Sequence, residues 1–211
     1  PQGNHFEGWT LLAAMAASTQ RVEVGCLVTC NTYRNPALLS DMAKTIDHIS
    51  NGRLILGLGA GWFERDYHEY DYAYGTAGSR LDALERSLEI ITQRWEVDVP
   101  KPLRQIPILI GGGGEKKTLR IAAKYATMTH FFADVRTFAH KMEVLNNWCA
   151  EFQRDPGEIE RVSAVRDDMS TAERDDYVAA GASHFILPMN EPWDYDAIEE
   201  LVRWRDSCNH K

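Results

Sequence analysis

Short apolar strands alternate strictly with amphipathic helices along the whole chain, and this order constrains the fold more than any other feature. Apolar residues recur at helical spacing in Gly8–Gln20, Ser79–Trp95 and Val135–Phe152. Short apolar runs such as Arg53–Leu58 and Pro107–Ile110 lie between the helices. The sequence predicts about six strands and seven helices, an α/β fold with a parallel sheet covered by helices, either doubly wound or closed as a barrel.

The remaining elements follow the same alternation. The first strand is predicted as one run, Arg21–Thr29, and the next helix extends from Asn35–Pro36 to a stop at Asn51–Gly52. The acidic, aromatic segment Trp62–Gly78 is predicted as a loop, and Glu115–Tyr125 as a helix that follows directly on a glycine run. The last elements predicted are strands at Met128–Phe132, Ile159–Val165 and His184–Leu187 and helices at Thr171–Ala180 and Tyr195–Asp206.

Composition limits the class of protein. The 211 residues are 44% hydrophobic, so they can build one core, and we expect residues 1–211 to form a single domain. Lys and Arg total 23 against 31 Asp and Glu, which argues against nucleic acid as a partner. Apolar runs such as Leu54–Leu58 are far shorter than the ~20 residues of a membrane helix, and nothing resembles an export signal, so we expect a cytoplasmic protein.

No metal site is predicted from the sequence. The four cysteines Cys26, Cys30, Cys149 and Cys208 lack paired CxxC spacing, and neither an HExxH motif nor an aspartate-rich loop occurs. Four cysteines in a chain of this length do not make a disulfide scaffold, so we expect reduced thiols. The first residue is Pro1 rather than Met, which suggests that an N-terminal portion precedes it.

Glycines follow two of the predicted strands, at the end where parallel α/β folds bind their ligands. Gly111–Gly114 comes after Ile108–Ile110 and precedes a helix, and is interpreted as a phosphate cradle or as a plain turn. The cluster Gly57–Trp62 departs from the dinucleotide fingerprint because its third glycine falls one residue early. Its small residues favour either the close approach of a planar ring or a tight turn.

Several side chains near strand ends are candidates for chemistry. His130 is a candidate general acid or base, with a satisfied core histidine as the equal alternative. Thr29 and Glu64 are weaker candidates, and Glu64 can equally belong to a solvated rim. The aromatic residues between Trp62 and Tyr74 are typical either of a pocket wall or of a loop that packs on itself.

Three segments together resemble one family. They are Leu27–Leu39 (LVTCNTYRNPALL), Asp47–Trp62 (DHISNGRLILGLGAGW) and Ile110–Arg120 (IGGGGEKKTLR). The chain is similar to the bacterial luciferase-like oxidoreductases, specifically the branch that uses the deazaflavin coenzyme F-420. The resemblance implies a (β/α)8 TIM barrel that lacks its first β-α-β segment here, because a complete barrel commonly needs ~250 residues.

The resemblance also implies a cofactor site at the barrel mouth. Leu27, Val28 and Thr29 are expected to form a bulge behind the deazaflavin ring, where the family often has a non-proline cis peptide, flanked by Cys30 and Asn31. The segment Ala60, Gly61 and Trp62 is expected to contact the ring or the substrate, and Gly112, Gly113 and Gly114 to hold the phosphate-bearing tail. Relatives carry a histidine at the position of His130.

The function implied is hydride exchange between coenzyme F-420 and a small organic substrate. One alternative is a monooxygenase of the same superfamily that uses FMN and oxygen. Another is a truncated, cofactor-free barrel that acts as a binding or assembly module. Relatives often form homodimers through early helices, so a homodimer is expected by analogy.

Overall fold

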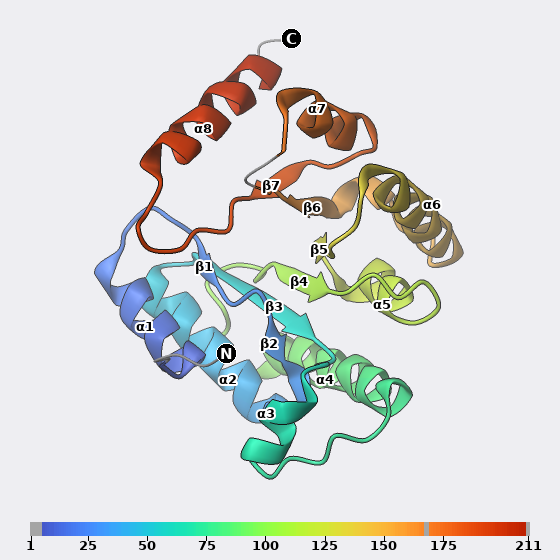
Figure 1. The fold of residues 1–211 in the computed structure, drawn as a ribbon. Helices are drawn as coiled ribbons and strands as arrows, with labels where there is room; N and C mark the ends of the chain where they lie inside the picture. The colour runs from blue at the N-terminus through green and yellow to red at the C-terminus, as the bar shows by residue number, and fades with distance from the viewer. Residues whose placement is uncertain (1–5, 167–168, 210–211) are drawn as a thin grey trace.

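The computed structural model describes residues 6–166 and 169–209. Seven strands form one sheet: β1 (Val24–Gly25), β2 (Thr29–Cys30), β3 (Leu54–Gly59), β4 (Ile108–Gly111), β5 (Met128–His130), β6 (Glu160–Ala164) and β7 (His184–Ile186). Every pair is parallel, in the order β1-β3-β4-β5-β6-β7 with β2 also on β3. The sheet curls as a barrel wall does but stays open in the described residues, so the parallel α/β sheet is confirmed and closure is not (Figure 1).

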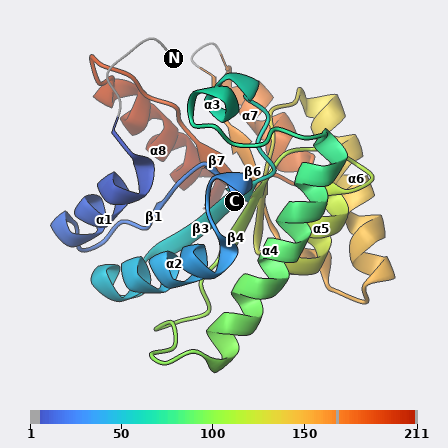
Figure 2. The same ribbon diagram turned by 90° about the horizontal axis from the view of Figure 1, so that it is seen from below.

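Within the described residues, eight helices accompany this sheet, and all but α3, which lies at the carboxyl ends of the strands, are on its outer side. They are α1 (Gly8–Ser18), α2 (Pro36–Ser50), α3 (Glu64–Glu69), α4 (Ala77–Val97), α5 (Thr118–Tyr125), α6 (Val135–Glu151), α7 (Thr171–Ala179) and α8 (Tyr195–Asn209), with short 3-10 turns at Asn31–Tyr33 and Pro156–Glu158. Figure 2 shows α2, α4, α5 and α6 outside the central strands. None of the helices in the described ranges is long and apolar enough to cross a membrane, and the cytoplasmic location stays a prediction.

Local capping explains why the long helices begin where the sequence predicts. The Asn35 side chain accepts hydrogen bonds from the first backbone N–H groups of α2, and Pro36 takes the first turn. Asn51, in the left-handed region, ends this helix. Thr76 and Ser79 form a reciprocal capping box at the start of α4. These polar signals are local in sequence, so the predicted bounds of both helices hold to within a few residues.

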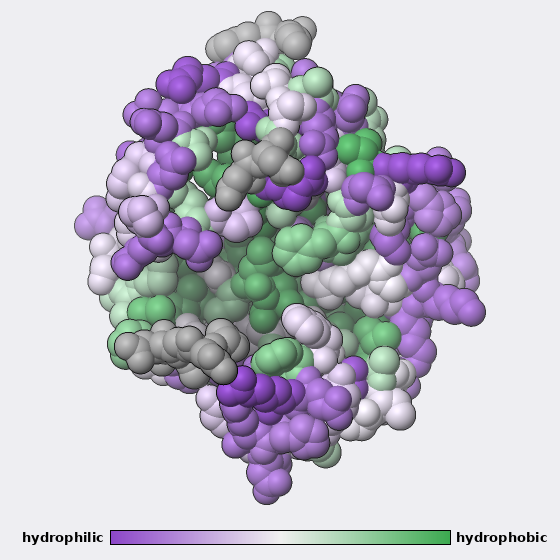
Figure 3. Space-filling model, in the orientation of Figure 1, coloured by the Kyte–Doolittle hydropathy of each residue, from purple (hydrophilic) through white to green (hydrophobic). Residues whose placement is uncertain are grey.

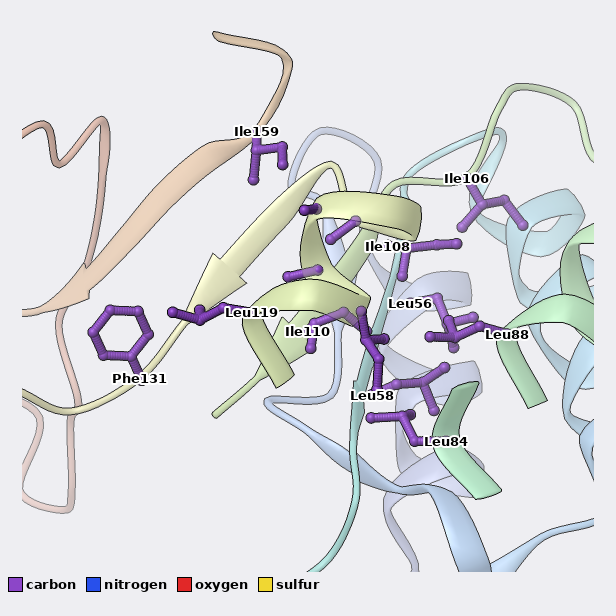
Figure 4. Close-up of a cluster of buried hydrophobic side chains, with 14 of the residues drawn as sticks. Leu56, Leu58, Leu84, Leu88, Ile106, Ile108, Ile110, Leu119, Phe131 and Ile159 are labelled. Carbon is purple, nitrogen blue, oxygen red and sulfur yellow. The ribbon is translucent and has the colours of Figure 1, made fainter. Parts of the chain in front are cut away.

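The core lies between the sheet and the helices. Leu56 and Leu58 of β3 point toward Leu84 and Leu88 of α4, and all four side chains are fully buried (Figure 4). Burying one such side chain contributes roughly 1.5–3 kcal/mol. Alternate strand residues therefore pack outward against helices, which fixes the strand register and leaves the other residues facing the inside of the curl.

The predicted strand Arg21–Thr29 is wrong as one continuous element. It forms two two-residue strands, β1 and β2, separated by a turn that contains a cis peptide between Leu27 and Val28. The bulge expected at this place is therefore present. Both short strands pair with β3, β1 at its beginning and β2 at its carboxyl end.

Two further predictions need correction. The segment predicted as a loop contains the helix α3, whose buried Tyr67 anchors it. The helix predicted from Glu115 begins only at Thr118, because Glu115–Lys117 form a turn. The four glycines therefore do not lead directly into a helix, and the phosphate cradle proposed for them has to rest on the loop itself.

Candidate functional site

A cavity of about 1360 Å³ lies at the carboxyl ends of β2, β3, β4 and β5. Pairing sets Cys30 beside Gly59, Gly59 beside Gly111 and Gly111 beside His130, so these four residues form one row across the strand ends. The cavity is larger than the ~300–1,000 Å³ typical of single-ligand pockets. The space-filling view shows a hollow with apolar side chains inside and hydrophilic ones around it (Figure 3).

Most of the predicted site residues line this cavity. They are Leu27, Val28, Thr29, Cys30, Ala60, Gly61, Trp62, Gly112, Gly113, Gly114 and His130. Two predicted residues do not. Asn31 is buried in the 3-10 turn, and Glu64 begins α3 with an exposed side chain 3.5 Å from His68. The catalytic role of Glu64 stays a prediction without support from this geometry.

The glycines of β3 and β4 make room for the bulge. A methyl group on Gly59 or Gly111 would lie 2.8 or 2.9 Å from Cγ2 of Val28, and one on Gly57 would lie 2.0 Å from the carbonyl oxygen of Cys26. Carbon atoms pack at about 3.5–4.0 Å, so none of these positions accepts a side chain without movement. The group that approaches these glycines in the structure is the Val28 bulge, and the approach of a planar ring stays a prediction.

A hydrogen-bonded cluster fixes the turn that follows β3. The Tyr67 hydroxyl lies 2.6 Å from Oγ1 of Thr32, 3.1 Å from Sγ of Cys30 and 3.3 Å from the carbonyl oxygen of Ala60. Burial, followed by the hydrogen bond to Cys30, raises the pKa of Tyr67 to about 12, so the phenol stays protonated at neutral pH. Gly61 has φ of +81°, and a side chain there would strike this hydroxyl. The phenol therefore ties α3 to the cavity wall.

Thr29 is held by a tryptophan that the sequence did not single out. Nε1 of Trp9 on α1 donates to Oγ1 of Thr29 at 3.0 Å, and both residues are buried. Glu7 caps α1 through the backbone N–H groups of Trp9 and Thr10 and also pairs with Arg34. The α1 helix thereby sets the orientation of the Thr29 hydroxyl beside the bulge.

The loop of four glycines is supported from the neighbouring helix α6. Nζ of Lys141 donates to the carbonyl oxygen of Gly113 at 2.6 Å, and Nε1 of Trp148 donates to that of Glu115 at 2.8 Å. Gly112 has φ of +121°, a conformation that only glycine adopts readily. The loop is therefore held in one shape with its backbone at the cavity.

Arg80 of α4 is a cavity residue that sequence reasoning missed. Its side chain is buried, its Nε donates to the carbonyl oxygen of Gly61 at 3.0 Å, and its guanidinium lies 4.0 Å from the centre of the Tyr74 ring. No carboxylate within the described ranges lies at ion-pair distance from it. Nη1 also donates to the carbonyl oxygens of Tyr74 and Gly75 at 3.1 and 3.4 Å. The guanidinium is therefore held by backbone oxygens and a ring, and it brings to the cavity a positive charge that can attract an anionic ligand group.

His130 lies at the end of β5 with one ring nitrogen engaged and one without a partner. Nδ1 lies 3.2 Å from the carbonyl oxygen of Val162, which can only accept, so we assign the ring proton to Nδ1. Nε2 is buried and has no hydrogen-bond partner in the part of the chain that the structure describes. Burial lowers the pKa of His130, partly opposed by the bond to Val162, so the ring is neutral at pH 7 and Nε2 is a free acceptor.

The comparison with known families follows this geometry. The sequence model of a family described as luciferase-like monooxygenase matches residues 1–207. The chain belongs to the luciferase-like monooxygenase family. Similar curated proteins include an F-420-dependent glucose-6-phosphate dehydrogenase of Amycolatopsis mediterranei, 28% identical over 59% of this chain and 41% of that protein. They also include a pyrimidine monooxygenase RutA of Methylorubrum extorquens, 28% identical over 81% of this chain and 52% of that protein.

Solved structures support the luciferase-like fold. An F-420-dependent secondary alcohol dehydrogenase in complex with an F-420–acetone adduct superposes with a TM-score of 0.75 at 17% identity, over 86% of this chain and 78% of that one. A type II Baeyer-Villiger monooxygenase from Pseudomonas putida in complex with FMN gives 0.62 at 18% identity, over 82% and 57%. This luciferase-like chain spans about half the length of the curated relatives that it matches.

The family assignment from sequence is thus confirmed, while its finer branch is not decided, because relatives of both kinds match. Luciferase-like relatives include proteins named for coenzyme F-420 and proteins named as monooxygenases or solved with FMN. Within the described residues, no group of three or more His, Cys, Asp or Glu side chains is arranged to hold a metal ion.

Proposed function

We propose that this chain is an oxidoreductase that exchanges a hydride between coenzyme F-420 and a small organic substrate. The observation that carries the proposal is His130, a neutral buried histidine whose Nε2 has no partner, in one cavity with the guanidinium of Arg80, which has no carboxylate partner within the described residues. Hydride exchange at an alcohol or ketone carbon needs one group that takes or returns a proton, and the cofactor supplies the electron pair.

The residues of the cavity fit a phosphate-bearing deazaflavin or flavin. Arg80 supplies a positive charge, and the backbone of Gly112–Gly114 supplies a surface without side chains, on which a phosphate-bearing tail can lie. The bulge at Val28 supplies an apolar wall for the ring. The cavity volume leaves space for a substrate beside the cofactor.

His130 is the proton-transfer group of the proposal. Its neutral ring accepts the hydroxyl proton at Nε2 when an alcohol is oxidised and returns it when a ketone is reduced. The Val162 carbonyl keeps the second proton on Nδ1 and holds the plane of the ring.

A monooxygenase that uses FMN and oxygen is the second candidate. It is favoured by the similarity to pyrimidine monooxygenases over as much as 81% of the chain. Both cofactors carry a phosphate, so Arg80 and the glycine loop serve either one. A cofactor-free binding or assembly module is the third candidate.

Titration of the protein with coenzyme F-420 and, separately, with FMN tests the proposal. Saturable binding of the deazaflavin, with FMN at least tenfold weaker, is expected. Tighter binding of FMN, together with oxygen consumption on addition of a reductant, would move the function to the monooxygenase. Binding of neither cofactor would overturn both assignments and favour the binding module.

We also propose that the protein forms a homodimer through α1 and α2. Helix α1 contains no charged residue, and its Leu11 and Met15 are exposed, as are Leu38 and Ile49 of α2. Sedimentation velocity tests this, and replacement of Leu11 and Met15 by Glu is expected to give monomers. A wild-type protein that sediments as a monomer at tens of micromolar would contradict it.

A further inference from the structure

Large aromatic side chains stand in solvent around the cavity. Trp62, after β3, and Phe132, after β5, are 79% and 83% exposed although both line the cavity. Tyr70 at the end of α3 is exposed at the same rim. An aromatic side chain can bury about 150–250 Å². This rim therefore offers apolar surface that the folded chain itself does not use.

The strands that carry Trp62 and Phe132 are spaced so that a flat ligand can bind between the two side chains. Gly59 of β3 pairs with Gly111 of β4, which pairs with His130 of β5, so Trp62 and Phe132 leave the sheet on strands two positions apart. Two inter-strand distances amount to about 10 Å. A ring in van der Waals contact on both faces needs about 7–8 Å. The loops that carry the two side chains thus start far enough apart to admit one ring system between them.

The charges at the rim are already paired. Arg34 pairs with Glu7, and Arg65 pairs with Glu69 at 2.6 Å. The carboxylate of Asp66 accepts a hydrogen bond from the Tyr33 hydroxyl at 3.4 Å. Arg80 is assigned above to the phosphate of the cofactor. No cation is left over for an anionic substrate among the described cavity residues, which favours a substrate without negative charge.

Phe132 also contacts the proton-transfer group. Its ring packs edge-on against the His130 ring, with centroids 5.0 Å apart. A guest that stacks on Phe132 therefore lies next to the His130 ring, whose Nε2 is buried and has no hydrogen-bond partner within the described residues.

We propose that the substrate is an uncharged, hydrophobic ring compound with a hydroxyl or carbonyl group next to the ring, bound between Trp62 and Phe132. The inference rests on the proposed function for its chemistry but not for its binding site. In the oxidative direction the carbinol C–H bond would break, a deazaflavin held in the cavity would take up the hydride, and His130 would take the hydroxyl proton on Nε2. The product is the ketone whose carbonyl group lies next to the ring, and the reverse reaction consumes the same hydride and proton.

Calorimetric titration with 1-(2-naphthyl)ethanol tests the substrate class, with 2-naphthoate as the charged analogue and glucose as the polar one. Each probe is added to the protein alone and to the protein saturated with coenzyme F-420. We expect saturable binding of the naphthyl alcohol in both states and at least tenfold weaker binding of the other two probes to the saturated protein. Equal or tighter binding of 2-naphthoate or glucose there would overturn the proposal.

The double variant Trp62→Ala/Phe132→Ala tests the location. It is expected to bind the naphthyl alcohol at least tenfold more weakly, because it loses both ring contacts. The matched control is Trp193→Ala, which removes a 51% exposed tryptophan that does not line the cavity, and is expected to bind as the wild type does. An unchanged affinity in the double variant would overturn the proposal.

Two further outcomes separate the hypotheses. If coenzyme F-420 fails to bind while the naphthyl alcohol binds as described, the proposed function is wrong and the aromatic site stands. The other outcome is that the wild type co-sediments with phosphatidylcholine vesicles while the double variant does not, and that binding of the naphthyl alcohol fails to saturate. In that case the rim is a membrane contact and the substrate proposal is wrong.

Discussion

Replacing Gly111 by Ala tests whether the glycines of β3 and β4 exist to accommodate the bulge. The added methyl carbon would lie 2.9 Å from Cγ2 and 3.1 Å from Cγ1 of Val28. The shortfall against a contact of 3.5–4.0 Å is roughly 0.4–1.1 Å. Overpacking of this kind typically costs about 1–3 kcal/mol. For a chain of this length that corresponds to a fall in Tm of about 2–12 °C.

The double-mutant cycle with Val28→Ala makes the expectation specific. Val28→Ala alone removes two methyl-sized groups and costs roughly 1.6 kcal/mol if they are fully buried. In the double variant the removed methyl groups vacate the space that the new one needs. Its free energy of unfolding should therefore match that of Val28→Ala alone, with a coupling energy of about 1–3 kcal/mol.

Urea denaturation of the wild type, both single variants and the double variant measures these terms. The matched control is Gly78→Ala in the first turn of α4, where the nearest atom to the new methyl group is Oγ1 of Thr76 at 3.7 Å. That variant should gain about 0.5–1 kcal/mol. Additive effects at Gly111 and Val28, or a Gly111→Ala protein as stable as the wild type, would refute the steric explanation.

Four further predictions concern the site. Arg80→Met should weaken FMN binding about 10–100-fold and leave riboflavin binding unchanged, because only FMN carries the phosphate; calorimetry with both ligands checks this, and equal losses would contradict it. His130→Ala should lower turnover about 10²–10⁴-fold at nearly constant cofactor affinity. In the wild type, kcat for alcohol oxidation should be flat at neutral pH and fall only below pH 6.5, because burial lowers the pKa of His130 and protonation removes the acceptor; a fall that begins above 6.5 would contradict this. Trp9→Phe should cost about 0.5–1.5 kcal/mol in urea denaturation through loss of the bond to Thr29, and Thr29→Val should abolish the difference.

Local signals account for what the sequence predicted well. The start of the helix at Pro36 was predicted from its Asn-Pro signal, and the apolar spacing in α4 and α6 predicted these two helices. The ends of the strands are also marked locally in the sequence. Parallel α/β folds bind ligands at the carboxyl ends of their strands, so the glycine loop and His130 were expected at the site. The family resemblance then supplied the bulge, since nothing in Leu27–Thr29 alone requires one.

The predictions were wrong where residues distant in the sequence determine the local structure. The split of the first strand depends on space left by Gly57, Gly59 and Gly111 on neighbouring strands, and no periodicity within residues 21–29 records it. Helix α3 has no apolar period and forms around the buried Tyr67, whose hydrogen-bond partners come from the end of β2 and the turn after β3. Arg80 sits in a helix that was predicted, but only the packing of α4 decides that its guanidinium turns toward the cavity.

The attachment of the glycine loop to α6 has a thermodynamic consequence. Four consecutive glycines lose much conformational entropy when they are ordered, and a free loop would lose it each time a ligand bound. Lys141 and Trp148 hold the backbone of Gly113 and Glu115 in place beforehand, so folding carries that entropic cost once. The loop is then already ordered before a ligand binds. The enthalpy and entropy of binding therefore reflect contacts made with the ligand rather than a loss of conformational entropy in the loop.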